Sequence, residues 1–181
     1  YDAGLSWKNV SDGFFATGSV GAVSVSESNN NIVVVGMGES PVRGVMTSSG
    51  DGVYKSVDAG ETWEHIGLEG TKHISQVRIH PNNPEVMFVS AQGSPYADTQ
   101  DRGVYRTTDG GKNWKKVLGN SQWTGATDIL IDPRNPNVLY AATWDRHRTV
   151  AAFMGGGPGS GIHKSVDGGE TWKKLHKGLP N

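Results

Sequence analysis

The densest group of side chains that could bind a ligand lies in residues 144–149, which read Trp-Asp-Arg-His-Arg-Thr. Two guanidinium groups beside an imidazole and an indole suit a ligand that presents a carboxylate, a phosphate or a sugar. The glycine-rich run that follows at 154–161 lacks the lysine and the strand–loop–helix setting of a phosphate-binding loop. We therefore predict that this loop binds a ligand through Trp144, Arg146, His147 and Arg148.

A structural interpretation of the same loop stays open. Ion-pair networks that only support the fold often imitate binding sites. In that case Asp145 would pair with an arginine, and His147 would pack beneath the glycine-rich run.

Several acidic side chains stand where a hydrolase would need them. A glycoside hydrolase requires two carboxylates about 5–10 Å apart. Glu39 directly follows an apolar run and Asp145 follows another predicted strand, so these two form the predicted catalytic pair. Loops of neighbouring units could also contribute Asp98, Asp101 and Asp128. Taken singly, each acid is equally at home in a solvated loop, because acidic residues are common in turns.

Three further residues complete the predicted binding set: Tyr96, Arg102 and Trp123. The two aromatic rings could stack on sugar rings or could pack between structural units, since aromatic side chains serve both purposes. The six histidines show no i, i+4 pair on a helix and no compact ligand spacing, so we predict no metal site and no cofactor.

These candidate residues stand on a scaffold that repeats. Residues 56–63 read Ser-Val-Asp-Ala-Gly-Glu-Thr-Trp, close variants return at 107–114 and 165–172, and a truncated copy spans residues 2–7. The interval of about fifty residues is typical of a propeller blade and longer than the unit of a helical solenoid. The residues expected to hold these turns are Asp2, Gly4, Trp7, Ser56, Asp58, Gly60, Trp63, Thr107, Asp109, Gly111, Trp114, Ser165, Asp167, Gly169 and Trp172.

Each part of the repeated motif has a role in closing a hairpin. The aspartate can accept hydrogen bonds from the backbone a few residues on, and the glycine two positions later tolerates a positive φ. The hydroxyl residue at the first position can tie the incoming strand to the turn. The tryptophan buries a large apolar surface between neighbouring units. We therefore interpret the motif as architecture rather than as a site.

The segments around these turns read as strands. Residues 22–26 alternate, 32–38 form a continuous apolar run, and 52–56 and 62–66 complete a unit of four. The same order follows at 74–79, 86–91, 103–107 and 113–118, and again at 127–131, 138–143, 161–165 and 171–175.

The predicted fold is all-β: a β-propeller fragment of three four-stranded blades at 20–70, 71–122 and 123–181, with the repeated turn between third and fourth strands. Residues 1–19 are predicted to hold one orphan outer strand, at 5–10, and a connector. The second-to-third loops, at 39–51, 94–102 and 145–160, are long and lie opposite the repeated turns. Long loops on a rigid scaffold commonly carry function. We therefore expect the ligand on this long-loop face.

Composition excludes several classes of function. A net charge of −1 gives no electrostatic reason to bind nucleic acid or an anionic membrane. The absence of cysteine excludes disulfides and thiol chemistry. No stretch of about eighteen apolar residues is present to span a bilayer.

Over essentially its whole length the chain resembles the Asp-box (BNR) β-propellers of the bacterial glycosyl-hydrolase-like and sortilin-like group. The resemblance rests on the repeated turns, on the Pro-x-Asn-Pro turns at 81–84 and 133–136, and on residues 143–152. It implies a propeller and an exported bacterial protein, periplasmic or extracellular. The related branches include sialidases, xyloglucanase-type endoglucanases, the sortilin receptor domain and photosystem assembly factors, so fold transfers among them while function does not.

Two hypotheses of function follow. The first is a binding propeller that recognises a glycan or a protein segment on the long-loop face. The alternative is a glycoside hydrolase similar to xyloglucanases, which place a catalytic Asp after the second strand of a blade, where Glu39 and Asp145 stand. A sialidase is rejected, because Arg78-Ile79 is followed by His80 rather than by proline.

Ring closure is the remaining question. Propellers close with about four to eight blades, so three blades do not form a ring. We expect the remaining blades to come from a longer parent chain, from a second chain or from self-association.

Overall fold

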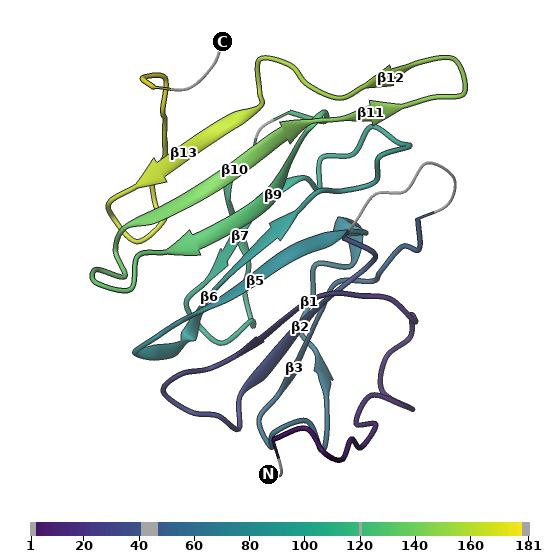
Figure 1. Cartoon of the computed structure of the whole chain (residues 1–181), viewed down its shortest axis with the longest axis vertical. Coiled ribbons are helices and arrows are strands. Elements are labelled where there is room, and N and C mark those ends of the chain that lie inside the picture. The colour runs from purple at the N-terminus through teal and green to yellow at the C-terminus, as the bar shows by residue number, and fades with distance from the viewer. Residues whose placement is uncertain (1–2, 41–46, 120, 179–181) are drawn as a thin grey trace.

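The computed structural model describes residues 3–40, 47–119 and 121–178. Three four-stranded antiparallel sheets follow one another along the chain, each lying beside the next (Figure 1). One short 3-10 turn at Glu69–Thr71 accompanies them, and the described residues contain no α-helix and no helix long and apolar enough to cross a membrane. The predicted all-β fold of propeller blades is confirmed.

The sheets, called blades 1 to 3 below, each pair their strands in sequence order. Blade 1 holds β1 (Val20–Val25), β2 (Val33–Met37), β3 (Val53–Ser56) and β4 (Glu64–His65). Blade 2 holds β5 (Ile74–His80), β6 (Asn83–Ala91), β7 (Gly103–Thr107) and β8 (Lys115–Leu118). Blade 3 holds β9 (Thr124–Ile131), β10 (Leu139–Asp145), β13 (Gly161–Ser165) and β14 (Lys173–Lys174). A small hairpin of β11 (His147–Arg148) and β12 (Phe153–Met154) rises from the loop between β10 and β13.

The hydrophobic core lies between the blades rather than within one sheet. Val34 and Val53 of blade 1 pack against Ile74 and Val77 of blade 2. In the same way Phe88 and Val104 of blade 2 pack against Ile129 and Leu139 of blade 3. A smaller cluster on the other face of blade 1 buries Val35, Met37 and Tyr54 beneath Phe15 and Trp63.

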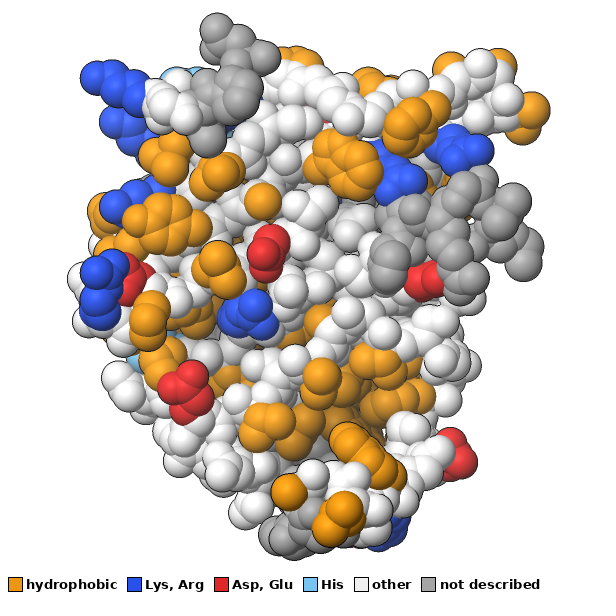
Figure 2. Space-filling model, in the orientation of Figure 1, with side chains coloured by type: hydrophobic (Ala, Val, Ile, Leu, Met, Phe, Trp, Pro, Cys, Tyr) orange, Lys and Arg blue, Asp and Glu red, His pale blue; other side chains and the backbone are white. Residues whose placement is uncertain are grey.

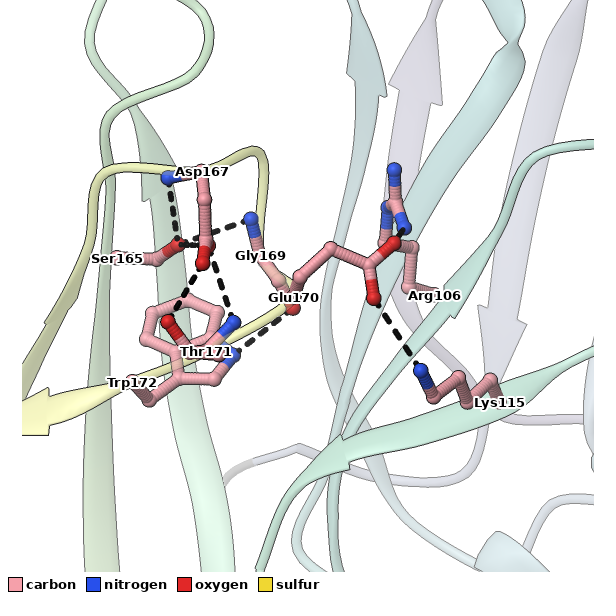
Figure 3. Close-up of polar contacts among 8 residues, drawn as sticks. All are labelled: Arg106, Lys115, Ser165, Asp167, Gly169, Glu170, Thr171 and Trp172. Carbon is pink, nitrogen blue, oxygen red and sulfur yellow. Dashed lines mark hydrogen bonds and ion pairs between the residues drawn. The ribbon is translucent and has the colours of Figure 1, made fainter.

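The three complete Asp-box turns share one set of hydrogen bonds, drawn for blade 3 in Figure 3. Ser165 Oγ donates to Asp167 Oδ1 over 2.7 Å and accepts from Gly169 N over 2.9 Å. Thr171 donates to the same carboxylate through its N–H, over 3.0 Å, and through its hydroxyl, over 2.5 Å. Equivalent bonds hold the turns of Asp58 and Asp109. The glycine has φ near +90° in all three turns, at Gly60, Gly111 and Gly169.

The tryptophan of the Asp-box ties a blade to the unit before it. Trp114 Nε1 donates to Ile66 O, after the last strand of blade 1, over 2.7 Å. Trp63 Nε1 donates in the same way to Val10 O over 2.8 Å. Trp172 differs, because its Nε1 donates to Gly169 O within its own turn while its ring packs against the core between blades 2 and 3.

The predicted orphan strand at residues 5–10 is wrong as a strand. The segment forms no ladder, because no third strand lies beside it to exchange hydrogen bonds. The segment still follows the path of a fourth strand. Its Val10 carbonyl accepts a hydrogen bond from Trp63 Nε1, just as the Ile66 carbonyl after β4 accepts one from Trp114 Nε1. The outer strands β4 and β14 are also shorter than predicted, two residues each.

The Asp-box carboxylates should make the fold sensitive to acid. Hydrogen bonds from Thr62 lower the pKa of Asp58 to about 2, and those from Asn113 lower the pKa of Asp109 to about 2. An unfolded aspartate has a pKa near about 3.9. A depressed folded pKa contributes stability above the unfolded value and loses it as pH falls toward the folded value, so stability should drop between about pH 4 and pH 2.

Asparagine at these positions removes the titration. In urea denaturation measured from pH 5 to pH 2, the variant Asp58→Asn/Asp109→Asn should be less stable at pH 5 yet lose less stability on acidification than the wild type. Parallel pH profiles for the two proteins would show that these carboxylates do not govern acid stability.

Candidate functional site

The long-loop face is organised by the hairpin β11–β12 of blade 3, which leans on the 94–102 loop of blade 2. Arg148 N donates to Pro95 O over 2.9 Å. His147 Nδ1 lies 3.2 Å from Asp98 Oδ1. The hairpin continues the line of β10 beyond the sheet in Figure 1, so loop residues of two blades meet at its base.

Arg102, predicted as a binding residue, holds these loops together through its guanidinium. Its side chain is 1% exposed. The guanidinium donates to Trp123 O over 3.2 Å and to Arg146 O over 2.7 Å, and its second nitrogen donates to Ser94 O and Ala97 O. Burial lowers the pKa of Arg102. Backbone carbonyls of three loop segments therefore accept the hydrogen bonds of this guanidinium.

Asp145, one of the two predicted catalytic acids, holds the glycine-rich run in place. The side chain is buried, and both carboxylate oxygens are occupied: Thr124 Oγ1 donates to Oδ1 over 2.5 Å and Gly159 N donates to Oδ2 over 2.7 Å. A Cβ on Gly157 would lie 2.5 Å from Oδ2, so the run closes directly over the carboxylate. The structural interpretation holds for Asp145, although its partners are a hydroxyl and an amide instead of an arginine.

Arg146 is a cation of this face whose guanidinium has no hydrogen-bond acceptor among the residues that the structure describes. Its side chain is 8% exposed, and the guanidinium carbon lies 4.7 Å from the ring centre of Trp144 and 5.7 Å from that of Phe153. Within the described part of the chain no hydrogen-bond acceptor pairs with this guanidinium, and its Nε is buried without a partner. Burial lowers the pKa of Arg146, and the neighbouring Arg148 lowers it further.

A small cavity lies beside Arg146. Its volume is about 10 Å³, and it lies between blades 2 and 3, lined by Gln92, Pro95, Arg102, Gly125, Thr127, Trp144 and Arg146. That volume holds about one water-sized group. A carboxylate or hydroxyl oxygen of a ligand would therefore fit against the guanidinium, while the larger part of the ligand would rest on the loops.

The other predicted binding residues differ in their contacts and in their exposure. Trp123 packs edge-on against His147, with ring centres 4.3 Å apart, so both rings also support the hairpin. Trp144 Nε1 donates to Gly155 O over 3.0 Å, which orients the indole beneath Arg146. Tyr96 is exposed, and its charge interaction with Arg146 raises the pKa of that guanidinium, against the effect of burial. The side chain of Arg148 is half-buried.

The two acids predicted as a catalytic pair, Glu39 and Asp145, each accept hydrogen bonds from the protein. Glu39 Oε2 accepts from Ser48 N over 3.1 Å, and its backbone carbonyl lies 3.2 Å from Nδ1 of the buried His73. Asp128 Oδ1 accepts from Ile129 N over 2.8 Å. No cluster of three His, Asp or Glu side chains suited to a metal occurs among the described residues.

Two residues at this site were not anticipated from the sequence. Phe153 of β12 covers Arg146 opposite Trp144, and Gln92 lines the cavity while its amide donates to Ser40 O over 3.2 Å. Neither stands in a motif. Only the pairing of β11 with β12 brings Phe153 back to Arg146. Residues 149–152, which read Thr-Val-Ala-Ala, contain no turn signal that would predict this hairpin.

Comparisons with known proteins agree with the fold. The chain is 35% identical over 79 residues, 43% of its length, to the vacuolar protein sorting/targeting protein 10 of Sordaria macrospora, and 25% identical over 96% of its length to a xyloglucanase of Hypocrea jecorina. It spans only 5% and 19% of those relatives.

Solved structures show the same architecture. An ancestral GH74 enzyme matches 90% of this chain and 19% of its own with a TM-score of 0.61 and 17% identity. YCF48 from Cyanidioschyzon merolae matches 94% of this chain and 40% of its own with a TM-score of 0.55 and 20% identity. The Sortilin-Vps10 family model, described as sortilin, neurotensin receptor 3, matches residues 51–181. The chain therefore belongs to the Sortilin-Vps10 family of β-propellers.

Proposed function

We propose that this chain is a ligand-recognition segment of a propeller, which binds a glycan or a protein segment on its long-loop face. The observation that carries the proposal is the guanidinium of Arg146, which is buried beside Trp144 and Phe153 and has no hydrogen-bond acceptor in residues 3–40, 47–119 and 121–178. A buried charge without a hydrogen-bond partner is costly. An oxygen of a ligand would remove that cost, and the aromatic rings beside it offer apolar contact area.

The names of the relatives support both ligand classes. One relative is a sorting protein and another a xyloglucanase, so protein segments and glycans are both reasonable ligands for this scaffold. We also propose that the protein is exported from the cytoplasm. Hydrolysis is the weaker alternative, because Asp145, one of the two predicted catalytic acids, is committed to the fold.

Replacing Arg146 tests the proposal. The purified chain is screened by calorimetry against xyloglucan oligosaccharides, oligogalacturonates and peptides with free carboxyl groups. For whichever class binds, Arg146→Met should weaken affinity by about tenfold or more, since a hydrogen bond to a charged group contributes about 1.5–3 kcal/mol. The methionine keeps the apolar contact with Trp144, so the circular dichroism spectrum and melting temperature should stay close to those of the wild type.

Arg134→Met is the matched control. Arg134 lies on the β9–β10 turn, away from the long loops, and pairs with Asp132 over 2.8 Å. Its loss should leave ligand affinity unchanged. Equal affinities of wild type and Arg146→Met for every ligand that binds, or no binding in any class, would contradict the proposal.

A further inference from the structure

The cavity beside Arg146 belongs to the junction of blades 2 and 3. Blade 2 contributes Gln92 and Arg102 to its lining, and blade 3 contributes Thr127 and Arg146. A Cβ on Gly125 would lie 2.5 Å from Gln92 O, so the two blades touch directly beside the cavity. In Figure 2, lysine or arginine side chains lie beside hydrophobic ones at the base of the region that the β11–β12 hairpin occupies in Figure 1.

The carboxylates near this cavity act on Arg102 and leave positive charge at Arg146. Burial lowers the pKa of Arg102, and the carboxylates of Asp98 and Asp145 oppose that effect. Burial also lowers the pKa of Arg146, and there the neighbouring Arg148 lowers it further. A ligand carboxylate suits this place better than a ligand hydroxyl, because the attraction of opposite charges adds to the hydrogen bond.

The guanidinium of Arg146 has an edge that matches a carboxylate. The Nε–H and one Nη–H of an arginine form a fork whose two hydrogen bonds fit the two oxygens of a carboxylate. Its Nε is the buried atom that has no acceptor among the described residues. The cavity of about 10 Å³ holds one water-sized group. That is room for one carboxylate oxygen, but not for the three free oxygens of a phosphate or a sulfate group.

Aromatic rings and neutral polar groups surround this guanidinium. Its carbon lies 4.7 Å from the ring centre of Trp144 and 5.7 Å from that of Phe153, and the ring of Tyr96, on the long loop of blade 2, is 43% exposed. The amide of Gln92 and the hydroxyl of Thr127 line the cavity. An aromatic ring offers apolar surface to the face of a sugar ring. Amides and hydroxyls suit sugar hydroxyls, which both donate and accept hydrogen bonds.

A protein segment fits this place less well than a sugar. Peptide recognition depends on side chains anchored in pockets or on strand edges with which the peptide backbone pairs. The cavity is too small for an anchoring side chain. On the side of β11 that faces blade 2, Arg148 N already donates to Pro95 O. A sugar ring needs neither a pocket nor a strand edge, since it can lie flat on an aromatic side chain.

We propose that the long-loop face binds an acidic glycan, with the carboxylate of a uronic acid unit on Arg146 and its sugar ring on Tyr96. Gln92 and Thr127 bind hydroxyls of the same unit. This inference rests on the function proposed above and narrows its ligand to one class. The charge of the uronic acid is what selects it over a neutral sugar of the same shape.

Methyl esterification separates the charge of the ligand from its sugar. In calorimetry trigalacturonate should bind the chain, and its methyl ester, which keeps every ring and hydroxyl, should bind about tenfold or more weakly. In Arg146→Met the acid should lose about tenfold or more in affinity, whereas the ester should lose less than about threefold, because the ester cannot form the charged pair that the variant removes. The acid and the ester should therefore bind this variant almost equally.

Tyr96→Ala tests the contact with the sugar ring. It should weaken the acid and the ester alike, by about threefold or more, because an apolar contact surface is lost from both complexes. Arg134→Met, which removes a guanidinium on the β9–β10 turn, should leave the affinity ratio of acid to ester unchanged. Loss of affinity for the acid alone in Tyr96→Ala would contradict stacking on this ring.

The competing ligand classes give results that overturn the inference. Equal affinities of the wild type for the acid and the ester, or no binding of trigalacturonate, would show that the site does not recognise a uronic acid. Tighter binding of xyloglucan oligosaccharides would assign it to neutral glycans, and tighter binding of a tripeptide of aspartate would assign it to protein segments. In these cases the proposed function stands if Arg146→Met weakens the ligand that does bind. If no ligand depends on Arg146, both proposals fail.

Discussion

Phe88→Ala is expected to lower the free energy of unfolding by about 3–5 kcal/mol, the usual cost of removing a buried phenylalanine. Phe88 is fully buried between blades 2 and 3. A Cβ on Gly169 would lie 2.8 Å from Phe88 Cε1, so the ring packs directly beneath the Asp-box turn of blade 3. Removing the ring should therefore destabilise both the core between blades 2 and 3 and the Asp-box turn that packs on it.

Urea denaturation measures this loss. Phe14→Ala, which removes a ring of the N-terminal segment that is 40% exposed, should change the free energy of unfolding by less than about 1 kcal/mol. Similar losses for the two variants would mean that the packing between blades does not carry the stability of the chain.

Arg102→Met should cost about 3 kcal/mol or more, because hydrogen bonds to a charged group contribute about 1.5–3 kcal/mol each. The substitution leaves four carbonyls without their donor, those of Ser94, Ala97, Trp123 and Arg146. Arg102→Lys should rescue only part of the loss, since an ammonium cannot reproduce the planar fork of a guanidinium. Hydrogen exchange should also quicken at the amides of Arg146 and Arg148, which bond to the same loops.

This experiment separates the structural role of Arg102 from the predicted binding role. If the Arg102→Met variant keeps its stability and its exchange protection but loses ligand affinity, Arg102 acts in ligand binding and not in support of the loops.

The sequence was sufficient for the Asp-box turns because the hydrogen bonds of their aspartate and hydroxyl side chains are local. Ser165, Asp167 and Thr171 satisfy one another within six residues, so the motif alone determines the turn. The stacking of blades was predictable for a related reason, since the turn returns at each blade and fixes the order of the strands. The orphan strand failed because a ladder needs a neighbour, which no property of residues 5–10 supplies.

The candidate site was only partly predictable, because its decisive contacts join distant residues. Nothing in the 144–149 segment distinguishes Asp145, which accepts from Thr124 and Gly159, from a free catalytic acid. Arg102 was predicted as a binding residue, and the carbonyls of three distant loop segments that it bonds could not be foreseen from its neighbours in sequence. Arg146 was singled out correctly as a member of a charged loop, but its burial between two aromatic rings depends on the β11–β12 hairpin.

The six tryptophans allow the most direct measurement of where a ligand binds. Trp123 and Trp144 stand on the long-loop face, whereas Trp7, Trp63, Trp114 and Trp172 belong to the Asp-box turns. Their indole N–H signals can be followed by ¹H–¹⁵N NMR while a glycan or peptide ligand is added. Recognition on the long-loop face predicts that the Trp123 and Trp144 signals shift and that the four Asp-box signals stay in place. Shifts confined to the Asp-box tryptophans would contradict it.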